Sequence, residues 1–120
     1  MSRRLIVLLA AVAALAALAV PAAQGAKKRK PPTKTVKVID NSLLPAKLKV
    51  RRGTKIVWKW DVANSNPHDV KLVKAPKGVK KFRSPTGTAG ITFARTLKAK
   101  GTYRLLCTFH ANMRQTIVVR

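Results

Sequence analysis

The side chains best suited to bind a soft metal ion gather in two short segments of this 120-residue chain. One segment comprises residues 66–68, and the other runs from Cys107 through His110 to Met113. Together they contain both histidines, the only cysteine and the only methionine besides Met1. Two imidazoles, a thiolate and a thioether form the donor set of a mononuclear copper site that exchanges single electrons. The sequence therefore predicts one copper ion bound by His68, Cys107, His110 and Met113.

The donor types also indicate what the site would do. Thiolate and thioether favour Cu(I) while imidazole suits Cu(II), so a mixed set can hold both oxidation states. Four protein donors leave no open position for a substrate, and the sequence shows no carboxylate pair, Ser-His-Asp signature or phosphate-cradling glycine loop. We therefore expect no catalytic residues and no enzyme. A zinc site made from Cys107 and the two histidines is less favoured, because a methionine thioether is not a typical zinc donor.

Short β-rich runs divided by turn residues must position these donors, since no stretch shows sustained helical periodicity. The runs fall at residues 35–39, 48–50, 55–60, 70–73, 80–82, 91–97, 102–107 and 115–119. About eight short strands at this spacing predict an all-β fold, a Greek-key β-sandwich or barrel. The irregular segment 74–90, with two prolines and three glycines, predicts the long connection between sheets that a Greek key requires.

The run 102–107 predicts how the thiol is presented. Side chains alternate between the two faces of a strand, so Tyr103, Leu105 and Cys107 share one face. If the first two point into the sandwich, Cys107 does too. The turn that follows then brings His110 and Met113 to the same place, each three residues after the previous donor. The remaining histidine must come from a neighbouring strand or its end.

These residues resemble the cupredoxin family, in particular the plastocyanin, pseudoazurin and amicyanin group. The resemblance rests on Asn-Pro-His-Asp-Val at residues 66–70, Gly-Thr-Tyr at 101–103 and Cys-x-x-His-x-x-Met at 107–113, and this last spacing is most similar to amicyanin. It covers roughly residues 35–120. It implies a cupredoxin-like sandwich that carries single electrons, with His68 and His110 as imidazole ligands, Cys107 as the thiolate and Met113 as the axial ligand.

The resemblance also implies roles for residues around the ligands. In the family, the edge of the C-terminal ligand histidine reaches the surface, which makes His110 the expected electron entry point. The expected docking face around it comprises Pro67, Phe109, Ala111 and Asn112, and the residues expected beside the ligands are Asn66, Asp69 and Thr108. Family members often have Asn after the first ligand histidine. Asp69 could keep the acceptor role of that Asn and lose its donor, and a carboxylate near copper would lower the reduction potential.

The N-terminal residues predict export. The cationic pair Arg3-Arg4, an apolar run at 5–20 and small residues up to Gly25 have the layout of a secretory signal. We predict a cleaved signal peptide over 1–25, a basic Pro-containing linker over 26–34 and a copper-binding domain over 35–120, in a periplasmic, cell-envelope or secreted protein. The alternative is a retained membrane anchor, although the apolar run is shorter than the ~20 residues usually needed to span a bilayer.

The charge bears on partners. The chain has 26 Lys and Arg against 3 acidic residues, a net charge of +23, and removal of residues 1–25 takes away only two of these cations. Such charge attracts acidic partners. We expect a monomer whose redox protein partner has an acidic docking surface, and contact with anionic lipid or a wall polymer would suit the same charge. The alternatives are a copper-trafficking protein without an electron-transfer role, or a basic protein that binds nucleic acid or another polyanion. Export and the lack of a nucleic-acid motif argue against nucleic acid.

Overall fold

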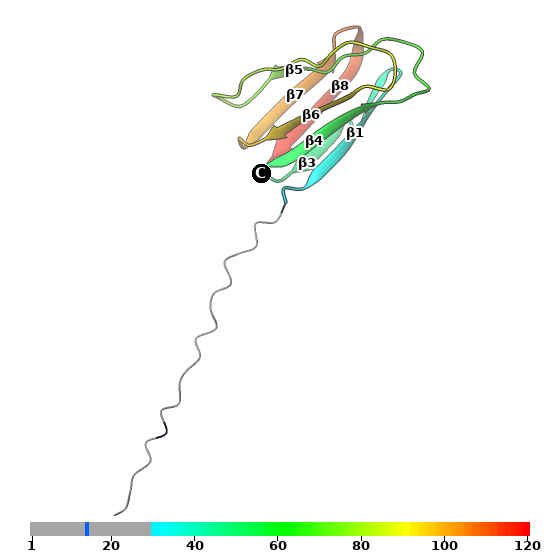
Figure 1. Cartoon of the computed structure of the whole chain (residues 1–120). Helices are drawn as coiled ribbons and strands as arrows, with labels where there is room; N and C mark the ends of the chain where they lie inside the picture. Colours follow the sequence, from blue (N-terminus) through cyan, green and yellow to red (C-terminus); the bar gives the residue numbers. More distant parts are fainter. Residues whose placement is uncertain (1–13, 15–29) are drawn as a thin grey trace, which may run out of the picture.

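Two four-stranded sheets packed face to face form the described part of the chain (Figure 1). The computed structural model describes Ala14 and residues 30–120, so the predicted signal peptide, apart from Ala14, and residues 26–29 of the predicted linker lie outside the described residues. The described part contains eight strands and no helix, and so no helix that could span a membrane. The predicted all-β sandwich is confirmed.

The strands are β1 (Thr33–Ile39), β2 (Ser42–Leu44), β3 (Lys47–Val50), β4 (Thr54–Trp60), β5 (Lys71–Lys74), β6 (Thr92–Leu97), β7 (Gly101–Cys107) and β8 (His110–Val119). The first sheet has the order β2-β1-β4-β6 and the second has the order β3-β8-β7-β5. The connection from β5 to β6 crosses from the second sheet to the first, as the irregular segment 74–90 predicted.

The structure differs from the predicted strands in three places. Residues 80–82 form no strand; the connection that contains them forms isolated bridges at Arg83 and Gly87, and its Phe82 ring packs against Trp58 and Phe93. The short strand β2 was not predicted, and it pairs with β1 through a two-residue turn in which Asn41 has a φ of 66°. Strand β8 begins at His110, five residues before the predicted run. Very short strands carry too little alternation to be recognised, because their pairing is decided by distant neighbours.

Alternating burial along each strand builds the core between the sheets. In β4 the side chains of Ile56, Trp58 and Trp60 are buried and alternate with the exposed Lys55 and Lys59 and the half-buried Val57. Trp58 donates its indole N–H to the Oε1 atom of Gln115 on β8 at 2.9 Å, which joins the two sheets inside the core. Burying each large apolar side chain stabilises the fold by about 1.5 to 3 kcal/mol. The core therefore holds the two sheets in a fixed relation.

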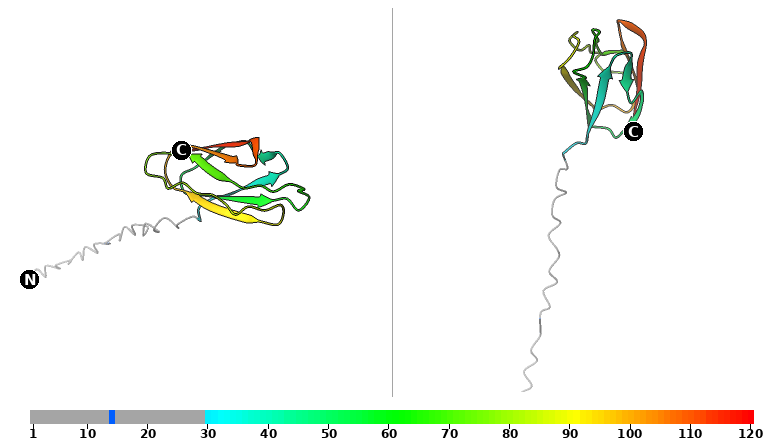
Figure 2. Two further views of the ribbon diagram at one scale, coloured as in Figure 1. Left: turned by 90° about the horizontal axis from the view of Figure 1, so that it is seen from above. Right: turned by 90° about the vertical axis from the view of Figure 1, so that its right-hand side faces the viewer.

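The direction of the strands brings the donor residues to one end of the sandwich. His68, in the segment after β4, lies 3.9 Å from the sulfur of Cys107 at the end of β7, so this segment and the β7–β8 hairpin meet at the same end (Figure 2). We call this the ligand end. It comprises residues 38–46, 60–70, 84–94 and 105–113, and the bridge between His68 and Gly87 closes it on one side.

Candidate metal centre

Cys107 lies at the last position of β7, inside the ligand end. Tyr103, Leu105 and Cys107 are all buried on one face of the strand, as alternation predicted. The thiol is free and 2% exposed. A free thiol at the end of a central strand is held by the backbone hydrogen bonds on both sides of that strand, which gives the sulfur a fixed position.

His68 is fully buried, and its ring is oriented by a carboxylate from another element. The Nε2 atom of His68 donates to Oδ1 of Asp40 at 2.8 Å, and Asp40 lies in the turn between β1 and β2. A proton on Nε2 leaves the lone pair on Nδ1, and this atom lies 3.9 Å from the Cys107 sulfur. Carboxylates commonly fix the tautomer of metal-binding histidines in this way.

Asp40 is itself held in the ionised form. The backbone N–H groups of Ser65 and Asn66 donate to its two oxygens at 2.8 and 3.2 Å. These hydrogen bonds, with the Ser65 contact and then the His68 contact largest, lower the pKa of Asp40 below its ordinary value. The sequence analysis missed this residue, because Asp40 and His68 are 28 positions apart. Asn66, which was expected beside the ligands, contributes its backbone there.

A register shift in the β7–β8 hairpin brings the other two donors to the thiol. Cys107 pairs with His110, whereas the preceding residue Leu106 pairs with Arg114, so residues 111–113 have no partner in β7. The predicted turn is therefore a two-residue hairpin followed by a bulge. Met113 is fully buried on β8, and it lines a small surface cavity together with His110. The bulge lets His110 and Met113 reach the same side of the hairpin.

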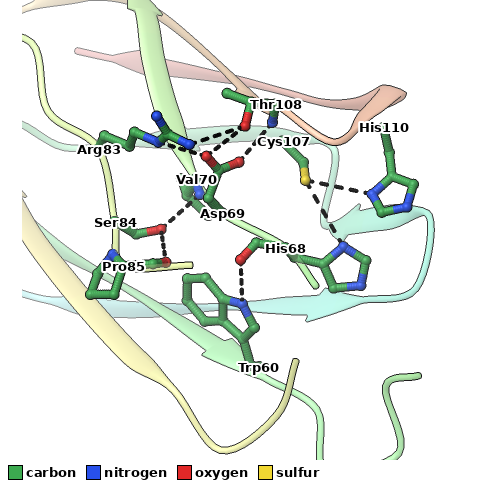
Figure 3. A network of polar contacts seen from close by, with 10 residues as sticks. All are labelled: Trp60, His68, Asp69, Val70, Arg83, Ser84, Pro85, Cys107, Thr108 and His110. Atoms are coloured by element: carbon green, nitrogen blue, oxygen red, sulfur yellow. Dashed lines mark hydrogen bonds and ion pairs between the residues drawn. The ribbon is translucent and has the colours of Figure 1, made fainter. Parts of the chain in front are cut away.

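The distances among the donor atoms suit one metal ion. The Nδ1 atoms of His68 and His110 lie 3.9 and 3.6 Å from the Cys107 sulfur, and the three ligand atoms lie within 4.8 Å of one another (Figure 3). Metal bonds of about 2.0 Å to nitrogen and about 2.3 Å to sulfur, at about 120° to each other, would separate these donor atoms by about 3.8 Å. The donor atoms of these three residues match the three corners of a trigonal site. The soft Met113 thioether fits copper rather than zinc.

Asp69 holds the hairpin beside the thiol. Its carboxylate is fully buried and accepts two hydrogen bonds from Thr108, from the backbone N–H and the hydroxyl, both at 2.7 Å. Arg83 donates its Nε–H to the same carboxylate at 2.7 Å. Burial raises the pKa of Asp69, but the hydrogen bonds from Thr108 and then the Arg83 contacts outweigh it, so the net pKa lies below the ordinary value. Asp69 therefore acts here as an acceptor of hydrogen bonds from Thr108 and Arg83.

Arg83 was not identified from the sequence. It lies in the connection between β5 and β6, 14 residues after Asp69, and its side chain is 51% exposed. The following residue, Ser84, exchanges backbone and side-chain hydrogen bonds with Val70, the neighbour of Asp69 in sequence. The connection is therefore tied to the ligand end at two adjacent positions, and it neutralises the buried charge there.

The four residues of the expected docking face lie on the surface around the donors. Pro67, Phe109, Ala111 and Asn112 are all exposed, and Phe109 is 50% exposed. Of the four expected ligands, only His110 is partly exposed. The Nδ1 atom of His110 faces the sulfur and the residue is partly exposed, so its ring connects the donor atoms with the surface.

A sequence profile of the cupredoxin-like domain matches residues 7–119. The chain belongs to the cupredoxin family. Among solved structures, this cupredoxin resembles a reduced amicyanin variant at 26% identity and a TM-score of 0.64, with 73% of this chain and 82% of that chain covered. A purple cupredoxin from Nitrosopumilus maritimus has 22% identity and a TM-score of 0.60, with 72% and 98% covered. A comparison with curated protein sequences gives no significant match.

A third similar structure is a copper-containing nitrite reductase from Thermus scotoductus, at 28% identity and a TM-score of 0.65. It covers 83% of this cupredoxin, which spans 25% of the length of that chain. The family and the donor set indicate the same cofactor. The side chains of His68, Cys107, His110 and Met113 form a type 1 site for one copper ion.

Proposed function

We propose that this cupredoxin is an exported carrier of single electrons, and that it is not an enzyme. The observation that carries the proposal is the meeting of two imidazole Nδ1 atoms at one buried thiol, at 3.9 and 3.6 Å, with a buried methionine alongside. Bound copper supplies one-electron exchange between Cu(II) and Cu(I). The donors that hold it differ in softness, so neither oxidation state is strongly preferred.

The residues around the donors keep them in place through both oxidation states. Asp40 fixes the ring of His68, and Asp69 fixes Thr108 beside Cys107. Within the described residues no buried polar side-chain atom lacks a hydrogen-bond partner. A network with every group satisfied resists rearrangement. Small rearrangement between oxidation states favours rapid electron exchange.

The partner and the location follow from the surface and the N-terminal sequence. We infer that a redox protein docks over His110, with Phe109 and Pro67 in the contact. Acidic groups of that partner would lie around the edge of the contact, where they meet Arg114, which is exposed and donates to the Ala111 carbonyl. Export to the periplasm, the cell envelope or the medium rests on the leader-like residues 1–25.

Addition of Cu(II) to the metal-free protein tests the proposal. We expect an intense visible thiolate-to-copper absorption that bleaches on reduction. The Cys107→Ser variant should lack the band, whereas Ser84→Ala, which changes a buried hydroxyl outside the donor set, should retain it. A band that survives Cys107→Ser would overturn the copper site.

Electron self-exchange separates a carrier from a copper-trafficking protein. Line broadening in the NMR spectrum of a mixture of oxidised and reduced protein measures this rate. A carrier exchanges electrons rapidly and keeps its copper when mixed with a metal-free acceptor protein. Slow exchange together with copper transfer to the acceptor would favour trafficking.

A further inference from the structure

The charged residues of the described part are distributed unevenly between its segments. Five of the 26 Lys and Arg precede residue 30, and the other 21 lie in the described part. None of them falls within the four segments of the ligand end, residues 38–46, 60–70, 84–94 and 105–113. All three acidic residues of the chain, Asp40, Asp61 and Asp69, lie within those segments. These four segments are therefore free of cations, with Arg83 and Arg114 beside them, and the rest of the described part is strongly basic.

The basic charge extends to the end opposite the donors. There the turn between β3 and β4 carries Arg51 and Arg52, and the turn between β6 and β7 carries Lys98 and Lys100. Backbone hydrogen bonds join these parts, from Arg52 N–H to the Arg120 carbonyl at 2.9 Å and from Gly53 N–H to the Leu97 carbonyl at 2.8 Å. We call Arg51, Arg52, Lys98, Lys100 and Arg120 the basic end. All five are exposed.

The N-terminal segment joins the domain at the basic end. Strand β1 starts there, since Lys55 N–H donates to the Pro32 carbonyl at 2.9 Å, and the start of β1 and the C-terminus lie at the same end in Figure 1. In the sequence, residues 26–34 contain five more cations, of which Lys30 and Lys34 lie in the described part, and the apolar run 5–20 precedes them. Clusters of basic residues bind the surface of an anionic bilayer.

We propose that the basic end docks on an anionic phospholipid surface and that the ligand end then faces away from it. The uneven charges orient the molecule, because the field of an anionic surface attracts the exposed cations of the basic end and repels Asp40 and Asp61 at the ligand end, where Arg83 neutralises Asp69. The inference uses the charge layout, which does not depend on copper. It also extends the proposed function, since this orientation leaves His110 free for a redox partner.

Vesicle binding of residues 26–120 tests the proposal, because this part contains both sheets and every core side chain that the structure describes. We expect binding to vesicles of equal parts phosphatidylglycerol and phosphatidylcholine, no binding to phosphatidylcholine alone, and release by high salt. Each Lys or Arg near an anionic surface contributes about fivefold to binding. The variant with Arg51, Arg52, Lys98 and Lys100 all changed to Gln should therefore bind at least tenfold more weakly.

A matched control removes the same charge elsewhere. Lys37, Lys47, Lys59 and Lys71 are exposed and lie on the halves of their strands nearer the ligand end. Changing these four to Gln should leave vesicle binding within about threefold of wild type, since they face away from the docked surface. Equal losses of vesicle affinity in the two variants would show that the charge attracts the protein to the vesicle without orienting it. That result would overturn the proposal. Changing the four basic-end residues to the alternative cation, Arg to Lys and Lys to Arg, controls for folding and should retain binding.

Spin-labelled lipid headgroups measure the orientation directly. They should broaden the backbone N–H signal of Gly53 at the basic end and leave that of Phe109 at the ligand end sharp. The opposite pattern would refute the docking geometry. Binding of a DNA duplex without binding of vesicles, at the same ionic strength, would assign the basic end to nucleic acid instead. Failure of the copper proposal would appear separately, as loss of the visible band in a protein that still binds vesicles.

Discussion

The pair of Asp69 and Arg83 offers a direct test of how the donor hairpin is held. Asp69 is fully buried and accepts hydrogen bonds from Thr108 and Arg83, so each partner can be changed separately. Asp69→Asn keeps an oxygen for the Thr108 N–H but turns an N–H₂ group toward Arg83. Arg83→Met keeps most of the side-chain stem and leaves the buried carboxylate without its countercharge. Each change alone should destabilise the metal-free protein.

The size of the coupling can be worked from the geometry. Two unit charges about 4 Å apart attract by about 1 kcal/mol in water and by about 4 kcal/mol at an effective dielectric constant of 20. The carboxylate is buried, whereas the Arg83 side chain is 51% exposed, so an intermediate value applies. We expect a coupling free energy of about 2 kcal/mol between the two residues. The double variant should be less destabilised than the sum of the single variants by this amount.

Urea unfolding of the four metal-free proteins measures the coupling, and redox titration of the copper-loaded forms adds a second readout. Removing the negative charge in Asp69→Asn should raise the reduction potential, because Cu(II) loses a stabilising carboxylate. Removing the positive charge in Arg83→Met should lower it. Single-variant losses of unfolding free energy that sum to the loss in the double variant within about 0.4 kcal/mol would refute this account of the pair. Reduction potentials that shift in the same direction in the two single variants would refute it as well.

Three further changes test other parts of the structure. Asp40→Asn should weaken copper binding by about tenfold to a hundredfold, since the ring of His68 loses its carboxylate partner. Competition with a chelator measures the copper affinity, and an unchanged affinity would contradict the role of Asp40 in orienting His68. Met113→Leu should raise the reduction potential while costing less than about 1.5 kcal/mol of stability, and an unchanged potential would remove Met113 from the donor set. Tyr103 is buried and donates to the Ala99 carbonyl, and burial raises its pKa above 10.0. The folded state thus disfavours its ionised form, and the wild type should lose stability relative to Tyr103→Phe as the pH rises above about 10. Urea midpoints at pH 8 and 11 measure the difference.

Much of the architecture could be predicted because it is encoded locally. Alternation along β7 indicated the inward face of Cys107, and the spacing of three residues between donors indicated a single hairpin. What escaped prediction depends on pairs far apart in the chain. Asp40 contacts His68 across 28 positions, and Arg83 contacts Thr108 across 25. No local pattern marks such pairs, because an Asp in a turn and an Arg in a loop are ordinary surface residues until the fold brings them together.

The bulge of β8 was hidden for a related reason. The run 115–119 alternates clearly, whereas residues 110–113 break the alternation and were expected to form an open turn. The pairing of Leu106 with Arg114 and of Cys107 with His110 shows that the break is a shift of register within the hairpin. Such a shift is visible only when both strands are known, since it is a relation between them.

The strand order of the second sheet has a consequence for when the protein can fold. Strand β8 lies between β3 and β7, so β3 has no neighbour in its sheet until its partner residues in β8, 69 positions further along the chain, have been made. Pairing across so many residues is slow to form. Because β7 and β8 also carry three of the four donors, no complete metal site exists before these two strands have been made. Acquisition of copper is thereby deferred until the β7–β8 hairpin has been synthesised and has folded.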